Sequence, residues 1–109
     1  MLTSLRKGLI KPMKQPSRDK DDTLYQAILT LNNLDECRRF FQDLCTVSEL
    51  RAMEQRMEVA LLLDDGLIYN DILERTGASS ATISRVNRAL LYGADGYKDV
   101  IPRVRENQK

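Results

Sequence analysis

The sequence predicts an all-α protein, and three observations support this prediction. Apolar residues recur at intervals of three and four along most of the chain, which is the period of an amphipathic helix. No stretch alternates apolar and polar residues over the length of a strand, and no hairpin turn is present. Glycines and small polar residues, which favour helix ends, separate the apolar stretches. The 109 residues suffice for one domain, and we expect 21–109 to form it.

Five helices are predicted before the C-terminal region, and each has its own signal. Apolar periodicity places the first at 22–31 and the second at Asn33–Cys45, where the asparagine can cap the helix. A capping box at Thr46–Glu49 begins the third, which continues to about Asp65. Its apolar residues occupy more than one face, as in a central helix shared between subunits. The fourth, at about 68–76, and the fifth, which runs from Ser79 or Ser80 to Leu91, belong to one motif. A short C-terminal helix is expected around 97–101.

The composition excludes several classes of function. The sequence has no histidine, which removes the commonest general base, the commonest metal ligand and the usual catalytic triads. Cys37 and Cys45 have no further soft ligand at metal-binding spacing, and we expect buried free thiols in a reducing cytoplasm. No apolar run approaches the roughly 20 residues of a membrane span. We therefore expect a cytoplasmic protein that is not an enzyme, with no metal, no cofactor and no membrane partner.

Charge is unevenly distributed along the chain. Residues 1–20 carry six basic residues and one acidic residue, a net charge of +5, whereas 21–109 carry eleven basic and fifteen acidic residues, a net charge of −4. Residues 1–20 also contain glycine and two prolines and show no sustained apolar period. We expect a flexible basic N-terminal arm, which is either solvated or in contact with nucleic-acid phosphates.

A helix-turn-helix is predicted at residues 69–91. Gly77 can adopt the positive φ that a tight turn between helices needs. Ile72 precedes this glycine by five residues, while Ile83 and Val86 follow it by six and nine. We expect these three side chains to meet in the angle between the helices and to fix how the second helix projects.

The second helix of the motif has the composition of a DNA-recognition helix. Either Ser79 or Ser80 can cap it, and residues 79–92 contain no acidic side chain. Small side chains allow close approach to a major groove, hydroxyls bond to bases or phosphates, and arginines reach phosphate or guanine. The predicted DNA-binding residues are Ser79, Ser80, Ala81, Thr82, Ser84, Arg85 and Arg88.

Residues 22–92 resemble the Trp-repressor-like superfamily, and specifically its small YerC/YecD-type members. The likeness is most specific in Phe40–Leu44, in Thr46 with Glu49–Arg56, and in Thr76–Arg88. The resemblance implies an intertwined homodimer with a recognition helix in each of two successive major grooves. It also implies a pseudo-palindromic operator with half-sites about one helical turn apart.

The resemblance also bears on an effector. Repressors of this kind hold tryptophan between two arginines near a threonine, and Thr46, Arg56 and Arg85 match that pattern. Each residue also has a second interpretation. Thr46 can be a helix cap, Arg56 can pair with nearby acidic residues, and Arg85 can contact DNA. Where the repressor has glycine and serine, this chain has Val86 and Ala89. The valine would crowd an indole and the alanine lacks a polar contact. A different small effector, or none, is therefore expected in place of tryptophan.

Two functions remain at this point. The first is a homodimeric, sequence-specific transcriptional regulator, most simply a repressor, whose partners are double-stranded DNA and a second copy of the chain. The alternative is a helical protein-interaction module that has lost DNA binding. The acidic body supports the alternative, as do Asn70 and Leu73, which stand where the repressor has basic residues.

Overall fold

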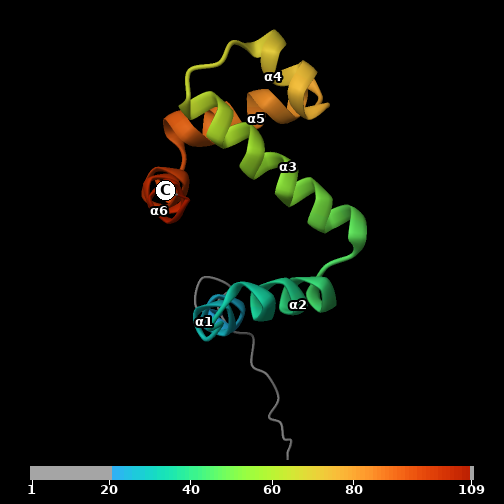
Figure 1. Cartoon of the computed structure of the whole chain (residues 1–109), viewed down its shortest axis with the longest axis vertical. Helices are drawn as coiled ribbons and strands as arrows, with labels where there is room; N and C mark the ends of the chain where they lie inside the picture. The colour runs from blue at the N-terminus through green and yellow to red at the C-terminus, as the bar shows by residue number, and fades with distance from the viewer. Residues whose placement is uncertain (1–20, 109) are drawn as a thin grey trace, which may run out of the picture. The chain divides into compact units, whose positions relative to one another are not determined.

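The computed structural model describes residues 21–108, and all the regular structure in this part is helical (Figure 1). The all-α prediction is confirmed, while the predicted arm at 1–20 lies outside the described residues. The chain divides into two compact units, with the boundary in the sequence between Phe40 and Phe41, and the expectation of a single domain stays a prediction. The helices are α1 (Thr23–Leu29), α2 (Leu34–Leu44), α3 (Val47–Asp64), α4 (Tyr69–Thr76), α5 (Ser80–Tyr92) and α6 (Gly96–Asn107).

The start of α2 is capped by the Asn33 side chain, as predicted. The amide of Glu36 donates to Asn33 Oδ1 at 2.8 Å. The carboxylate of Glu36 in turn accepts from the Asn32 amide at 2.9 Å. Neither α1 nor α2 contains a fully buried residue. Cys37 and Cys45 are free thiols, as expected, but they are only partly buried in this chain and not buried as predicted.

The capping box at the start of α3 is present as predicted. The Thr46 hydroxyl accepts from the Glu49 amide at 3.1 Å, and the Glu49 carboxylate accepts from the Thr46 amide at 2.8 Å. The bond from the Thr46 backbone amide to the carboxylate, and after it a hydrogen bond with the Thr46 side chain, lower the pKa of Glu49 because they stabilise its ionised form. The helix runs for 18 residues and is followed by Gly66, whose φ is +86°.

The core of the second unit lies where the C-terminal half of α3 meets α4, α5 and α6. Figure 1 shows α4 and α5 packed against this half of α3. Each of the four helices contributes at least one fully enclosed side chain. The buried core residues are Val59, Ala60, Ile72, Ala78, Ile83, Val86 and Ile101.

The C-terminal helix α6 is longer than the sequence predicted. It continues past 97–101 to Asn107 and includes Pro102 in its interior. Pro102 removes one backbone donor, a cost that ended the predicted helix at this point. The helix continues because Ile101 is anchored in the core. Tertiary packing therefore outweighs the local penalty.

A second anchor of α6 is Arg105, which binds the C-terminal end of α3. Its Nη2 donates to the Leu61 carbonyl at 3.1 Å. The same nitrogen lies 3.3 Å from Asp64 Oδ2 and 2.9 Å from Asp65 Oδ1. A cation at a helix C-terminus is favourable because unpaired carbonyls gather there. This contact between residues 44 apart in sequence could not be predicted from spacing.

The turn glycine provides the first test of this fold. Gly77 has φ +71°, yet no atom lies within 4 Å of a Cβ built on it. Replacing it with alanine should therefore cost only the left-handed backbone penalty, about 1 kcal/mol of unfolding free energy. Gly96→Ala is the matched control, because that site is equally open and its φ is not positive. Urea denaturation measures both, and equal midpoints for the two variants would contradict this account.

Candidate nucleic-acid interface

Helices α4 and α5 form the predicted helix-turn-helix, with a three-residue turn between them. Gly77 adopts the left-handed conformation, and its amide donates to the Leu73 carbonyl at 3.0 Å, which ends α4. Of the two serines that could cap α5, Ser79 does so, because its Oγ accepts from the Thr82 amide at 3.1 Å. The motif extends one residue beyond the predicted end at 91, to Tyr92.

The turn is also held by polar contacts that sequence reasoning missed. The Thr76 hydroxyl donates to the Ile72 carbonyl at 2.7 Å and accepts from the Ala78 amide at 3.0 Å. Gln55 of α3 donates from Nε2 to the Thr76 carbonyl at 3.1 Å. The hydroxyl directly before the turn glycine was the available signal for the first two contacts. The glutamine lies 21 residues away and gave none.

A buried apolar contact sets the direction in which α5 projects, as predicted. Ile72 of α4 and Ile83 of α5 have no exposed surface, and Val86 is 1 % exposed. Fully burying side chains of this size stabilises by about 1.5–3 kcal/mol each. Because Ile83 and Val86 lie three residues apart, they share one face of α5, and the opposite face is left in solvent.

The predicted DNA-binding residues form two groups, the two engaged in the cap of α5 and the five that are not. Ser79 caps α5, and Thr82 is partly buried beside it. The other five lie exposed along the helix, and they are Ser80, Ala81, Ser84, Arg85 and Arg88. Neither arginine forms an ion pair within residues 21–108, so both positive charges are available to a ligand. This face can bind an anion and present hydroxyls and a methyl group to it.

Tyr69, the first residue of α4, also belongs to this face and was not predicted. Its hydroxyl donates to the Ser80 carbonyl at 2.9 Å and lies 3.4 Å from Ser84 Oγ. The hydroxyl of Ser84 lowers the pKa of Tyr69, because a donor stabilises the phenolate. A surface pocket of about 340 Å³ lies beside the ring. It is lined by Leu63, Tyr69, Ile83, Ser84, Asn87, Arg88, Leu91 and Tyr92.

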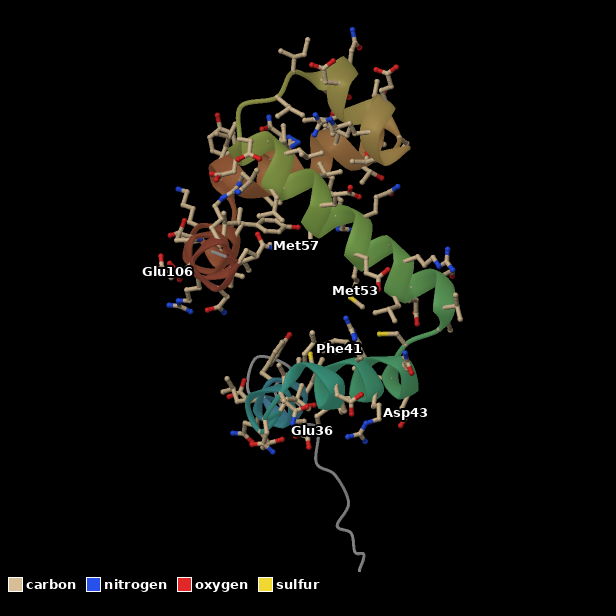
Figure 2. The ribbon with its side chains drawn as sticks, in the orientation of Figure 1. Glu36, Phe41, Asp43, Met53, Met57 and Glu106 are labelled. Atoms are coloured by element: carbon tan, nitrogen blue, oxygen red, sulfur yellow. The ribbon has the colours of Figure 1, made fainter. Side chains whose placement is uncertain are left out.

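A second hollow is an open apolar groove of about 410 Å³ between α3, α5 and α6. Figure 2 shows Met57 on the side of α3 that faces α6, where it lines this groove. The other lining residues come from the end of α5 and from the loop and helix that follow. They are Ala89, Ala94, Gly96, Tyr97 and Val100. The groove offers no charged group for a polar ligand.

The residues predicted for an effector pocket line neither hollow. Thr46 is at the N-terminal end of α3, Arg56 is partly buried in its middle, and Arg85 is exposed on α5. Ten residues of helix separate Thr46 from Arg56, a rise of about 15 Å. Val86, expected to crowd an indole, is instead enclosed in the core. The pocket stays a prediction.

The fold and this face define a helix-turn-helix protein. The chain belongs to the Trp repressor protein family, whose family model matches residues 20–105. That family is one of helix-turn-helix DNA-binding regulators and is not an enzyme family. Within 21–108, the helices are too short or too polar to cross a membrane, and no three potential metal ligands cluster.

Individual relatives agree with this assignment. The chain is 51 % identical over 87 residues to the uncharacterized protein YerC of Bacillus subtilis (strain 168), covering 80 % of this chain and 84 % of YerC. A crystal structure of a Trp-repressor candidate from Staphylococcus aureus is 48 % identical, with a TM-score of 0.74 over 77 % of this chain and 84 % of that one. A TrpR-like protein from Eubacterium eligens ATCC 27750 is 54 % identical, with a TM-score of 0.73 over 76 % and 86 %. The Trp-repressor-like fold and the resemblance seen in the sequence are confirmed.

The cap of α5 gives the second test. Ser79→Ala removes the acceptor of the Thr82 amide and should lower the unfolding free energy by about 1 kcal/mol. Ser80→Ala, one residue later, removes an exposed hydroxyl that accepts from no backbone amide within 21–108, and it should leave the urea midpoint unchanged. A larger loss from Ser80→Ala than from Ser79→Ala would reassign the cap.

Proposed function

We propose that this chain is a homodimeric, sequence-specific transcriptional regulator, and that it represses by occupying a pseudo-palindromic operator. The observation that carries the proposal is the exposed, acid-free face of α5, held in place by the buried contact of Ile72, Ile83 and Val86. Arg85 and Arg88 supply two unpaired positive charges on that face. Membership of a family of DNA-binding regulators supports the same conclusion.

The chemistry of this face suits a major groove. The N-terminal turns of α5 carry Ser80 and Ala81, whose small size lets backbone and bases approach closely. An arginine can donate two parallel bonds to guanine, or one or more to phosphate. On α4, Asn70 and Leu73 offer no positive charge, so Arg75 and the basic segment at 1–20 take over phosphate contacts in this proposal.

Exposed apolar side chains support the homodimer. Leu29, Leu34 and Val47 are all more than 60 % exposed, although each lies in or beside a helix that should bury such residues. The apolar groove beside α6 is a further uncovered surface. We assign both to the interface with a second copy of the chain. The family's helix-turn-helix regulators pair so that two recognition helices meet two half-sites, which supports this occupant.

A dimer also bears on the effector. Because Thr46 and Arg56 lie about 15 Å apart along one helix, a single small molecule can touch both only if they come from different chains. We propose that any effector binds at the dimer interface between Thr46 of one chain and Arg56 and Arg85 of the other. Ala89 offers such a ligand no hydrogen bond, which argues against tryptophan.

The third test is selection of bound sequences from a random duplex pool, with and without tryptophan. We expect a pseudo-palindrome with half-sites about one turn apart, selected without tryptophan. Arg85→Ala/Arg88→Ala should weaken binding of the selected duplex and reduce the salt slope by about 2 if both residues touch phosphate. Arg51→Ala/Arg103→Ala removes the same charge from exposed sites on α3 and α6 and is the matched control.

Three results would contradict the proposal. Unchanged binding by a folded Arg85→Ala/Arg88→Ala protein would show that another face binds DNA. Enrichment only in the presence of tryptophan would show that tryptophan is the corepressor. No binding at low salt would leave the protein-interaction module as the function.

The fourth test concerns the dimer. Val100 lines the apolar groove and is 43 % exposed, so Val100→Glu should place a charge in the interface and shift the protein towards monomer in sedimentation. Asn107→Glu, an exposed site near the end of the same helix, should sediment as the wild type does. A wild-type protein that is monomeric at micromolar concentration would exclude the interface.

A further inference from the structure

We propose that Tyr69 is a positioning residue for the recognition helix, and that Arg85 and Arg88 read the bases while Ser84 helps Tyr69 to hold the helix. This inference rests on the proposed DNA-binding function and names the residues that give it specificity. Three features of the face formed by α4 and α5 support the inference.

The first feature is that the buried contact under α5 does not fix the helix completely. Apolar contacts between Ile72, Ile83 and Val86 are non-directional, so they set how closely the helices approach and constrain rotation of α5 only loosely. A hydrogen bond is directional. The bond of 2.9 Å from Tyr69 to the Ser80 carbonyl therefore fixes the rotation of the first turn of α5, at the helix edge that the core leaves open.

The second feature is how the protons of this hydroxyl cluster are used. Tyr69 donates its only hydroxyl proton to the Ser80 carbonyl, so in the 3.4 Å contact with Ser84 the serine must be the donor. The proton of Ser84 is therefore directed at the phenol oxygen and not at a base. Ser84 acts with Tyr69 in holding the helix.

Two further hydroxyls of the helix, those of Ser79 and Thr82, are bound within the cap. Ser79 donates to Thr82 Oγ1 at 3.1 Å and accepts from the Thr82 amide, so this pair is engaged in the cap. The Ser80 hydroxyl also interacts with the Tyr69 hydroxyl. Within residues 21–108, the guanidinium groups of Arg85 and Arg88 have no partner. These two guanidinium groups remain for bases and phosphates.

The third feature is that the Tyr69 bond lies at the surface. Tyr69 is 40 % exposed, and water can replace its bond when the hydroxyl is removed. Losing the bond should therefore change the orientation of α5 far more than the stability of the fold. Binding and stability can then be separated by experiment.

The experiment compares Tyr69→Phe, Ser84→Ala and the double variant on two duplexes, the one selected by the wild type and a scrambled one. Tyr69→Phe should weaken binding of the selected duplex by about three- to tenfold, which is the contribution of one oriented hydrogen bond. The same variant should leave both the affinity for the scrambled duplex and the urea midpoint unchanged. Ser84→Ala leaves the bond from Tyr69 to the Ser80 carbonyl in place, so its effect should be smaller. The double variant should lose no more than Tyr69→Phe alone, because removing the Tyr69 hydroxyl already removes the contact with Ser84.

Tyr92→Phe is the matched control, since Tyr92 ends the same helix, is 82 % exposed and should bind as the wild type does. Unchanged selectivity in Tyr69→Phe would overturn the inference while leaving the proposed function intact. Additive losses in the double variant would show that Ser84 reads a base, and would overturn it as well. Equal losses on both duplexes with a lower urea midpoint would reduce Tyr69 to a structural role. A wild type without selectivity would reject the proposed function itself, and the inference with it.

Discussion

The buried contact between Ile72, Ile83 and Val86 is the interaction on which the second unit depends. It packs on Val59 and Ala60, so α3 supports both helices of the motif at once. Three consequences follow from this one contact. It orients α5, it turns the serines and arginines of that helix outward, and it leaves α3 to continue beyond the core with apolar side chains that a single chain does not fully cover. The direction of the recognition helix and the surface left for a partner therefore have a common origin.

The position of α5 depends on two kinds of interaction, apolar burial and hydrogen bonds. Apolar burial supplies the stability, because it scales with area and tolerates small shifts of the helices. Hydrogen bonds supply the orientation, because their strength depends on angle. Gln55 and Thr76 fix the turn, Ser79 fixes the first residue of the helix, and Tyr69 fixes its rotation. A helix that must match base edges needs this second set more than a helix that only fills a core.

Local signals made most of this fold predictable from sequence, and long-range contacts account for what was missed. Thr46 with Glu49, and Gly77, act within four residues of themselves, so their roles could be recognised directly. The full length of α6 could not, because it depends on Arg105 reaching the end of α3. Tyr69 was missed for the same reason, since its partners lie 11 and 15 residues away on another helix. The partial exposure of Cys37 and Cys45 was missed because a helical apolar face does not reveal whether its own chain covers it.

The distribution of charge favours one orientation in which the protein approaches DNA. Residues 21–109 carry a net charge of −4, so most of this surface repels a phosphate backbone. The acid-free face of α5 is an exception, and attraction there combined with repulsion elsewhere favours one orientation of approach over the others. A uniformly basic protein would bind DNA more tightly but in many orientations, most of them without base contacts. Weak overall attraction with a single attractive face, that of α5, therefore favours selective binding. This selectivity requires that α5 is held rigidly, so that Arg85 and Arg88 reach the same atoms in every encounter.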